Sequence, residues 1–312
     1  MPASRHSFLG TLLGLALTGL MACGSARPAG PVPLHGQAQL PRINALQAAG
    51  ETDVDLRALM SPVKDQGERN TCNAFAATAL MEFLIGRQQG QLPDLSENYA
   101  YWLGKTQTLN TEYLRETYAH IDGLAGFLAV EAYARGSMAE SAWPYERQNW
   151  LQTGNPGCKQ VKGEPDTACF TGQPPQHAQP LPYRLKPVYI ERERIADYLL
   201  SKKTPVVFNL QWVQAAVGPQ GDLRMPTQRE LAQAGGHVIT LVGFQPRQKR
   251  FIFRNSYGPH WGKGGYGTLP EAYLLQHCEV CPYLASAAGM APEVRDFVHK
   301  ASMGVSGELV TR

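Results

Sequence analysis

The stretch Gln66–Phe75, which reads QGERNTCNAF, joins a polar turn to an alanine-rich segment and places Cys72 at the junction. Apolar side chains recur at helical spacing after the cysteine, which predicts a helix over residues 72–87. Asn70 or Thr71 is expected to supply the side-chain oxygen that caps its first turn. The cysteine therefore stands where a helix begins.

A cysteine at a helix start has the chemical environment of a nucleophile. Unpaired backbone N–H groups and the positive end of the helix dipole stabilise an anion there, which favours a thiolate. The alternative is that Cys72 is a small buried apolar residue, as a cysteine in a helix usually is. Position alone does not decide between the two.

His237 is the histidine that best fits a general base. It follows two glycines and begins HVITLVGF, a run typical of a buried strand, which a short polar turn separates from RFIFRNSYG. The two runs predict a hairpin that folds about Arg247 and brings Asn255 close to His237. An amide oxygen there would accept the imidazole N–H and turn the other ring nitrogen toward a thiol. Taken singly, a buried rim histidine and a turn asparagine are the alternatives.

Gln66 completes this set of polar residues. It lies six residues before Cys72 in a DQG turn, so its amide is placed to join the Cys72 backbone N–H in an oxyanion hole. The alternative is an exposed turn glutamine.

Composition narrows the classes of function. The chain has 312 residues and 43% hydrophobic content, which is ordinary for a globular protein with a core. Lysine and arginine number 29 against 26 acidic residues and are scattered, so nucleic acid is not an expected partner. Cys278 and Cys281 form a C-x-x-C with His277 adjacent, but no second pair at zinc spacing accompanies them, so neither a metal nor another cofactor is expected.

The N-terminus predicts an exported protein. Residues 1–22 carry Arg5 and then an apolar run too short to span a membrane, as in a signal peptide. The run ends in LMAC, which resembles the lipobox of bacterial lipoproteins and makes Cys23 the expected lipidated residue; ordinary cleavage after Ala26 is the alternative. The expected location is the periplasmic side of the envelope or the cell surface, with residues 23–50 as a linker.

The rest of the chain predicts an α+β protein of two unlike lobes. Helical patterns come first and strand-like runs rich in valine, isoleucine and phenylalanine come later. The expected segments are helices over 95–105 and 126–135, a loop insertion over about 147–183, a folded domain over 51–285 and a tail over 286–312.

An oxidising compartment predicts disulfides. Cys158 and Cys169 are expected to staple the loop insertion, and Cys278 and Cys281 a local bridge, although pairing between the two sets stays open. These pairings leave Cys72 as the remaining thiol after Cys23.

The ordered pieces resemble the papain-like cysteine peptidases. The resemblance lies in PVKDQGERNTCNAFA, GGHVITLVGF and FRNSYGPHWGKGGYGTL, and it extends from about Val54 to Tyr266. It implies a helical lobe and a barrel-like antiparallel lobe with a substrate cleft between them.

The same resemblance implies the roles of the site residues. Cys72 would be the nucleophile, His237 the acid and base, Asn255 the orienting residue and Gln66 the oxyanion donor. Four residues are expected to bind substrate: Gly123, Gly236, Tyr257 and Trp261.

Several positions depart from the family pattern. Arg69 stands where the family usually has a second cysteine, so the loop must be held without that disulfide, and its cation is expected to favour the thiolate. Asn73 replaces an aromatic residue, and Tyr257 stands where a tryptophan commonly shields the asparagine. A single glycine, Gly123, represents the pair that lines the substrate groove.

The expected function is an endopeptidase that hydrolyses peptide bonds through an acyl-enzyme. The expected partners are a peptide or protein substrate and a membrane that holds the lipid anchor, and the expected state is a monomer. One alternative is a peptide-binding protein of this fold with little turnover. Another is acyl transfer to an amine instead of water.

Overall fold

The structure is a computed structural model that describes residues 53–148, 157–278 and 303–310. The predicted signal peptide, the linker, Cys23 and Cys281 lie outside these ranges. None of the helices in the described ranges is long and apolar enough to cross a membrane.

Helix α1 (Cys72–Gln89) is the central helix of the molecule and begins at the predicted residue. Its first fifteen residues are buried, and Gly90 ends it in a left-handed conformation. The predicted side-chain cap is wrong. Thr71 occupies the N-cap position, but its hydroxyl pairs with the hydroxyl of Tyr145 at 2.6 Å and makes no cap hydrogen bond.

Two other predicted helices form with shifted ends. Helix α2 (Glu97–Gln107) begins after Ser96, whose hydroxyl accepts from the Tyr99 N–H and caps the first turn. Helix α4 (Gly126–Ala132) is shorter than predicted, because the three following N–H groups donate to carbonyls three residues back and tighten the chain into turns.

The remaining helices are short. They are α3 (Glu112–Tyr118), α6 (Ala168–Thr171), α7 (Ile195–Lys202), α8 (Gln228–Leu231) and α9 (Glu271–Gln276).

The main sheet has seven strands in the order β4-β9-β5-β6-β7-β8, and β1 also pairs with β6. All its pairs are antiparallel. In the described residues the sheet is open, so the predicted antiparallel architecture is present but is not a closed barrel. The strands are β1 (Val54–Asp55), β4 (Arg184–Glu191), β5 (Val206–Trp212), β6 (Gly235–Gln245), β7 (Arg250–Arg254), β8 (Tyr266–Pro270) and β9 (Met303–Val310).

The predicted hairpin is formed by β6 and β7. Thr240 pairs with Arg254, and the register shifts at a bulge between Leu241 and Gly243. The bulge occurs where β1 pairs with β6, at Gly243. A Cβ atom at Gly243 would lie 2.3 Å from the Val54 carbonyl oxygen, so only glycine fits there.

Strand β9 comes from the segment expected to be a tail. It pairs along its whole length with β4 and through Val305 with Val207 of β5. The domain boundary between residues 285 and 286 stays a prediction, but this strand beyond it belongs to the main sheet.

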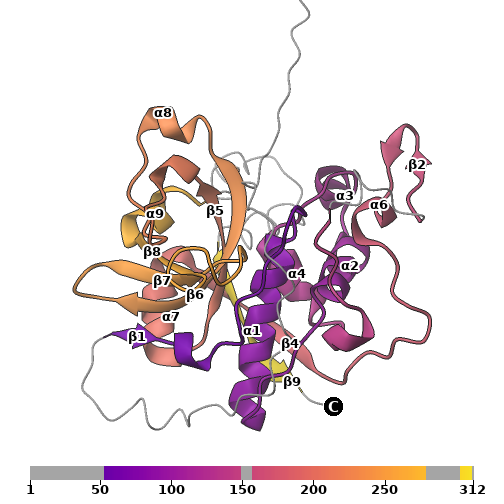
Figure 1. The fold of residues 1–312 in the computed structure, drawn as a ribbon, viewed down its shortest axis with the longest axis horizontal. Helices are drawn as coiled ribbons and strands as arrows, with labels where there is room; N and C mark the ends of the chain where they lie inside the picture. The colour runs from indigo at the N-terminus through magenta and orange to yellow at the C-terminus, as the bar shows by residue number, and fades with distance from the viewer. Residues whose placement is uncertain (1–52, 149–156, 279–302, 311–312) are drawn as a thin grey trace, which may run out of the picture.

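Helix α1 packs against the sheet and contacts α2 and α4, and α4 also packs directly against β4, β5 and β9 (Figure 1). One buried core includes α1, α4 and the facing side of the sheet, and a second core packs α7 and α9 against the sheet. Across the first core, the Thr240 hydroxyl of β6 donates to the Ala76 carbonyl of α1 at 3.2 Å. The sheet and the nucleophile helix are thereby held in contact.

Candidate active site

His237 and Asn255 form a hydrogen-bonded pair at the end of the β6–β7 hairpin. The Nε2 of His237 lies 2.8 Å from Oδ1 of Asn255, and both residues are buried. The same oxygen accepts the Ser256 backbone N–H at 2.8 Å, which fixes the direction of the amide. An amide oxygen facing Nε2 requires that this nitrogen carry the proton, so Nδ1 has the free lone pair.

The other ring nitrogen of His237 can accept a proton. Nδ1 is buried and has no hydrogen-bond partner among the described residues. A buried polar nitrogen without a partner is costly, and such costs persist mainly at functional sites.

Cys72 lies on α1, the helix that packs against the strand of His237. It is a buried thiol at the first position of α1 and belongs to the same core cluster as Val238, the residue after His237. The Thr240–Ala76 hydrogen bond joins the two elements within four residues of both side chains.

Burial favours the neutral form of the His237 imidazole. It lowers the pKa of His237 to about 4, and the hydrogen bond with Asn255 opposes this shift. A neutral imidazole with an unprotonated Nδ1 is the form that accepts a proton from a thiol.

Gln66 is buried, which excludes the exposed turn glutamine. Its Oε1 accepts the Ser256 hydroxyl at 2.6 Å, and its Nε2 donates to the Arg69 carbonyl at 2.8 Å. The amide is therefore held at both ends, and one N–H of Nε2 remains for another acceptor.

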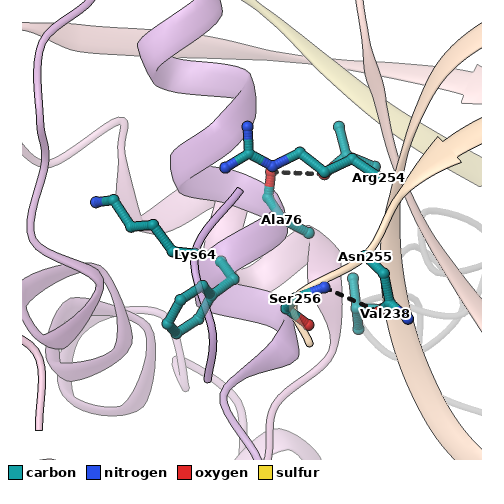
Figure 2. A pocket seen from close by; sticks show the side chains of 8 residues that line it. Lys64, Ala76, Val238, Arg254, Asn255 and Ser256 are labelled. Carbon is teal, nitrogen blue, oxygen red and sulfur yellow. Dashed lines mark hydrogen bonds between the residues drawn. The ribbon is translucent and has the colours of Figure 1, made fainter. Parts of the chain in front are cut away.

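Figure 2 shows a small cavity between α1 and the β6–β7 hairpin, on the side of Asn255 that faces Ala76. Lys64 also lines it, but its ammonium group extends away from Asn255 (Figure 2) and binds Asp94 and Glu97. Arg254 also lines the cavity, and its guanidinium donates to the Ser61 and Pro62 carbonyls.

Comparison with known proteins agrees with this arrangement. A model of the papain family of cysteine proteases matches residues 51–287. The chain belongs to the papain family of cysteine proteases.

Curated proteins similar to the chain include other papain-family members. Cysteine proteinase 3 of Entamoeba histolytica is 26% identical over 72% of this chain and 64% of its own length. Cathepsin K of Gallus gallus is 22% identical over 75% and 62%. An uncharacterized peptidase C1-like protein of Acanthamoeba polyphaga mimivirus is 35% identical over 33% and 32%. The chain thus spans between about a third and two thirds of the length of these relatives.

Two solved structures share the papain-like fold. Xylellain, a cysteine protease from Xylella fastidiosa, matches with a TM-score of 0.55 and 21% identity over 78% of this chain and 90% of that chain. Procathepsin L2 of the Tenebrio molitor larval midgut matches with a TM-score of 0.51 and 20% identity over 84% and 69%.

Aromatic residues surround the histidine of this papain-family chain. The Tyr257 ring lies 5.0 Å from the His237 ring and 6.0 Å from the Trp261 ring. Tyr257 therefore lies beside the His237 ring, and its shielding of Asn255 stays a prediction. Trp212, which no motif in the sequence singled out, also lies against the histidine, with its ring 4.8 Å from the His237 ring. Its position in the sequence could have indicated this contact, because Trp212 ends β5, the strand before β6, which carries His237.

Gly123 differs from the expected groove glycine. Its backbone N–H donates to the Tyr101 hydroxyl at 2.8 Å, and its carbonyl lies 3.4 Å from the Lys105 ammonium group. Both groups that were expected to pair with substrate are engaged within the protein. Gly236 pairs with Gln211 of β5, and its part in substrate binding stays a prediction.

The cysteines follow the predicted division where the structure describes them. Cys158 and Cys169 form a disulfide in the loop insertion. Cys278 is also disulfide-bonded, whereas Cys281, its expected partner, lies outside the described residues. In the described ranges no three His, Cys, Asp or Glu side chains gather as metal ligands.

Proposed function

We propose that the chain is a cysteine endopeptidase in which Cys72 is the nucleophile, His237 the acid and base, Asn255 the orienting residue and Gln66 an oxyanion donor. The observation that carries the proposal is the His237–Asn255 pair at 2.8 Å with Nδ1 left without a partner. Membership of the papain family supports it.

In the acylation step, the Cys72 thiol transfers its proton to Nδ1 of His237. The sulfur attacks the peptide carbonyl, and the negative oxygen accepts hydrogen bonds from the Cys72 backbone N–H and from Nε2 of Gln66. The C–N bond then breaks, the leaving amine takes the proton from His237, and a thioester remains.

In the deacylation step, His237 removes a proton from water, and the resulting hydroxyl attacks the thioester carbonyl. The C–S bond breaks and Cys72 recovers its proton, so the reaction consumes one water per bond. Asn255 keeps Nε2 protonated throughout, and Nδ1 alone exchanges protons with the thiol and with water.

The first test of this function is Cys72→Ala. Removing the nucleophile should reduce hydrolysis of a fluorogenic peptide library to background, and an epoxysuccinyl inhibitor should label the wild type at position 72 alone. The matched control is Cys158→Ser, which removes a cysteine from the surface loop and should keep both properties. Hydrolysis by Cys72→Ala at the wild-type rate would contradict the proposal.

A peptide-binding function is the second candidate. The altered groove glycine at Gly123 and Asn73, which replaces the aromatic residue after the nucleophile position, motivate it, because both changes would lower turnover. The absence of an epoxysuccinyl adduct on Cys72 at neutral pH would favour this function over the peptidase.

We also propose that the mature chain is exported and held to a membrane by lipid on Cys23. The apolar run of residues 8–21 and the LMAC sequence support this location.

A further inference from the structure

Arg69 is a buried arginine in the nucleophile loop, residues 66–71, which leads into Cys72. Its side chain is only 2% exposed. Nη1 donates to Oδ1 of Asn98 at 2.5 Å and to the Glu146 carbonyl at 2.9 Å, and Nη2 donates to the Phe170 carbonyl at 3.1 Å. The guanidinium also lies 4.8 Å from the centre of the Tyr145 ring. One side chain thus ties the loop to three separate segments.

The backbone of the same residue holds the oxyanion glutamine. The Arg69 carbonyl is the acceptor for Nε2 of Gln66, and the Ser256 hydroxyl holds the opposite end of that amide. Because the guanidinium anchors the residue, it also sets the position of this carbonyl. The direction of the remaining Gln66 N–H therefore depends on the Arg69 side chain.

We propose that Arg69 is a positioning residue that acts through Gln66, an inference that rests on the proposed peptidase function. It replaces, with hydrogen bonds, the disulfide that the family pattern would place at this loop. The planar guanidinium is suited to this task, since its fork of donors reaches several acceptors at once, which a lysine ammonium on a flexible stem does not do.

The nucleophile loop has other attachments, so its fold does not depend on Arg69 alone. The Asn70 N–H donates to Asp122 at 3.0 Å, and the Glu68 N–H donates to the Arg147 carbonyl at 3.0 Å. The Tyr145 hydroxyl donates to the Gln66 carbonyl at 2.8 Å. Loss of the guanidinium should leave these contacts and release chiefly the Arg69 carbonyl.

The experiment is a double-mutant cycle between Arg69→Met and Gln66→Ala. In the wild-type background, Arg69→Met should lower kcat about tenfold to a hundredfold with little change in KM, because a transition-state donor is misdirected. In the Gln66→Ala background, Arg69→Met should lower kcat by less than about threefold, because the Gln66 donor is already absent. Arg69→Lys should lie between Arg69→Met and the wild type.

Alkylation of Cys72 by iodoacetamide separates positioning from general damage. This reaction forms no oxyanion, so its limiting rate at high pH, where the thiol is fully ionised, should be that of the wild type in both Arg69 variants. The matched control is Arg57→Met, which removes a more exposed arginine bound to Asp55 and should change neither assay.

Three results would overturn the inference: equal losses from Arg69→Met in both backgrounds, alkylation that slows in parallel with hydrolysis, or an Arg69→Lys chain that does not fold. A wild type that hydrolyses no peptide would remove the proposed function together with this inference. An active wild type with independent effects at the two sites would remove this inference alone.

Discussion

At the scale of single residues, the site depends on which atoms of His237 and Gln66 are occupied. Asn255 Oδ1 accepts a hydrogen bond from Nε2 of His237, and Nδ1 has no partner among the described residues. The Arg69 carbonyl accepts one N–H of the Gln66 amide, and the second N–H remains available. Each polar group is therefore oriented by a partner that does not react. This separation allows buried side chains to remain ready for substrate.

The burial of His237 predicts a pH-dependent stability. Its folded pKa of about 4 lies below its ordinary value of 6.5, so the unfolded chain binds the proton first as the pH falls. The pKa shift of His237 therefore adds to the free energy of unfolding above pH 6.5. This added stability falls by about 2–3 kcal/mol as the pH falls toward 4. Urea unfolding of the Cys72→Ala chain at pH 6.5 and pH 4 measures it.

The variant for this measurement is His237→Gln in the same Cys72→Ala background. Glutamine cannot take up the proton. Between pH 6.5 and pH 4, the free energy of unfolding of this variant should therefore fall by about 2–3 kcal/mol less than that of its parent. His260→Gln, at an exposed histidine, is the control and should leave the fall unchanged. An equal fall in the His237 variant and its parent would show that the histidine is not held neutral.

Sequence reasoning was most successful for residues that lie in short local patterns. Cys72 stands at a helix start, and the predicted hairpin brings His237 and Asn255 into hydrogen-bond contact. The approach of Cys72 to this pair stays a prediction. The anchoring role of Arg69 was missed because its partners Asn98 and Phe170 are 29 and 101 residues away. The expected electrostatic effect of Arg69 on the thiolate stays a prediction.

At the scale of elements, α1 and α2 are joined by a buried charge cluster. The Lys64 ammonium group lies 2.9 Å from Glu97 and 3.5 Å from Glu82, both of which are buried, and 2.6 Å from Asp94. The Lys64 ammonium group therefore lies within ion-pair distance of three acidic side chains. Burial raises the pKa of Glu97 to about 8, and Lys64 opposes the shift.

Glu97→Gln should make stability less sensitive to alkaline pH. A folded pKa above the unfolded value means that stability is full below pH 4.5 and is lost as the pH rises through 8. Glutamine resembles the protonated acid, so the variant should gain about 1–3 kcal/mol relative to its parent between pH 5 and pH 8. Urea unfolding at the two pH values tests this.

The control for this cluster is Asp94→Asn, which changes a half-exposed partner of the same lysine. It should show no comparable gain. A Glu97→Gln chain that loses stability equally at both pH values would indicate that Glu97 is ionised and that its ion pair with Lys64 is the main contribution.

Element prediction succeeded where periodicity is local and failed where pairing is distant. The β6–β7 hairpin lies within one short stretch, and its turn identifies its partners. Strand β9 pairs with β4, which lies more than a hundred residues earlier, and no local pattern specifies that partner. The fold class was predictable from the order of the elements, whereas the order of strands in the sheet was not.

At the scale of the whole molecule, two cores on opposite faces of the sheet hold the nucleophile helix against the histidine strand. The proposed nucleophile Cys72 and the proposed base His237 come from the two elements of this contact, so the proposed site requires both. The proposed lipid on Cys23 would hold this unit at a membrane surface through a linker and would not alter the site.

The anchor is tested by cell fractionation. Cys23→Ser removes the lipid attachment point, so the protein should move from the membrane fraction to the soluble fraction, and incorporation of labelled palmitate should cease. Cys72→Ser is the control and should stay in the membrane fraction with its label. A Cys23→Ser protein that remains with the membrane would contradict the lipid anchor.

Strand β9 also determines when the enzyme becomes complete during its synthesis. The ribosome makes Cys72 and His237 well before residues 303–310, and until then β4 and β5 lack the strand that lies between them. β5 is the neighbour of β6 at His237, where it pairs through Leu210. A nascent chain that ends before residue 303 therefore carries Cys72, His237 and Asn255 without the strand between β4 and β5, and we expect the proposed proteolysis only after translation has passed residues 303–310.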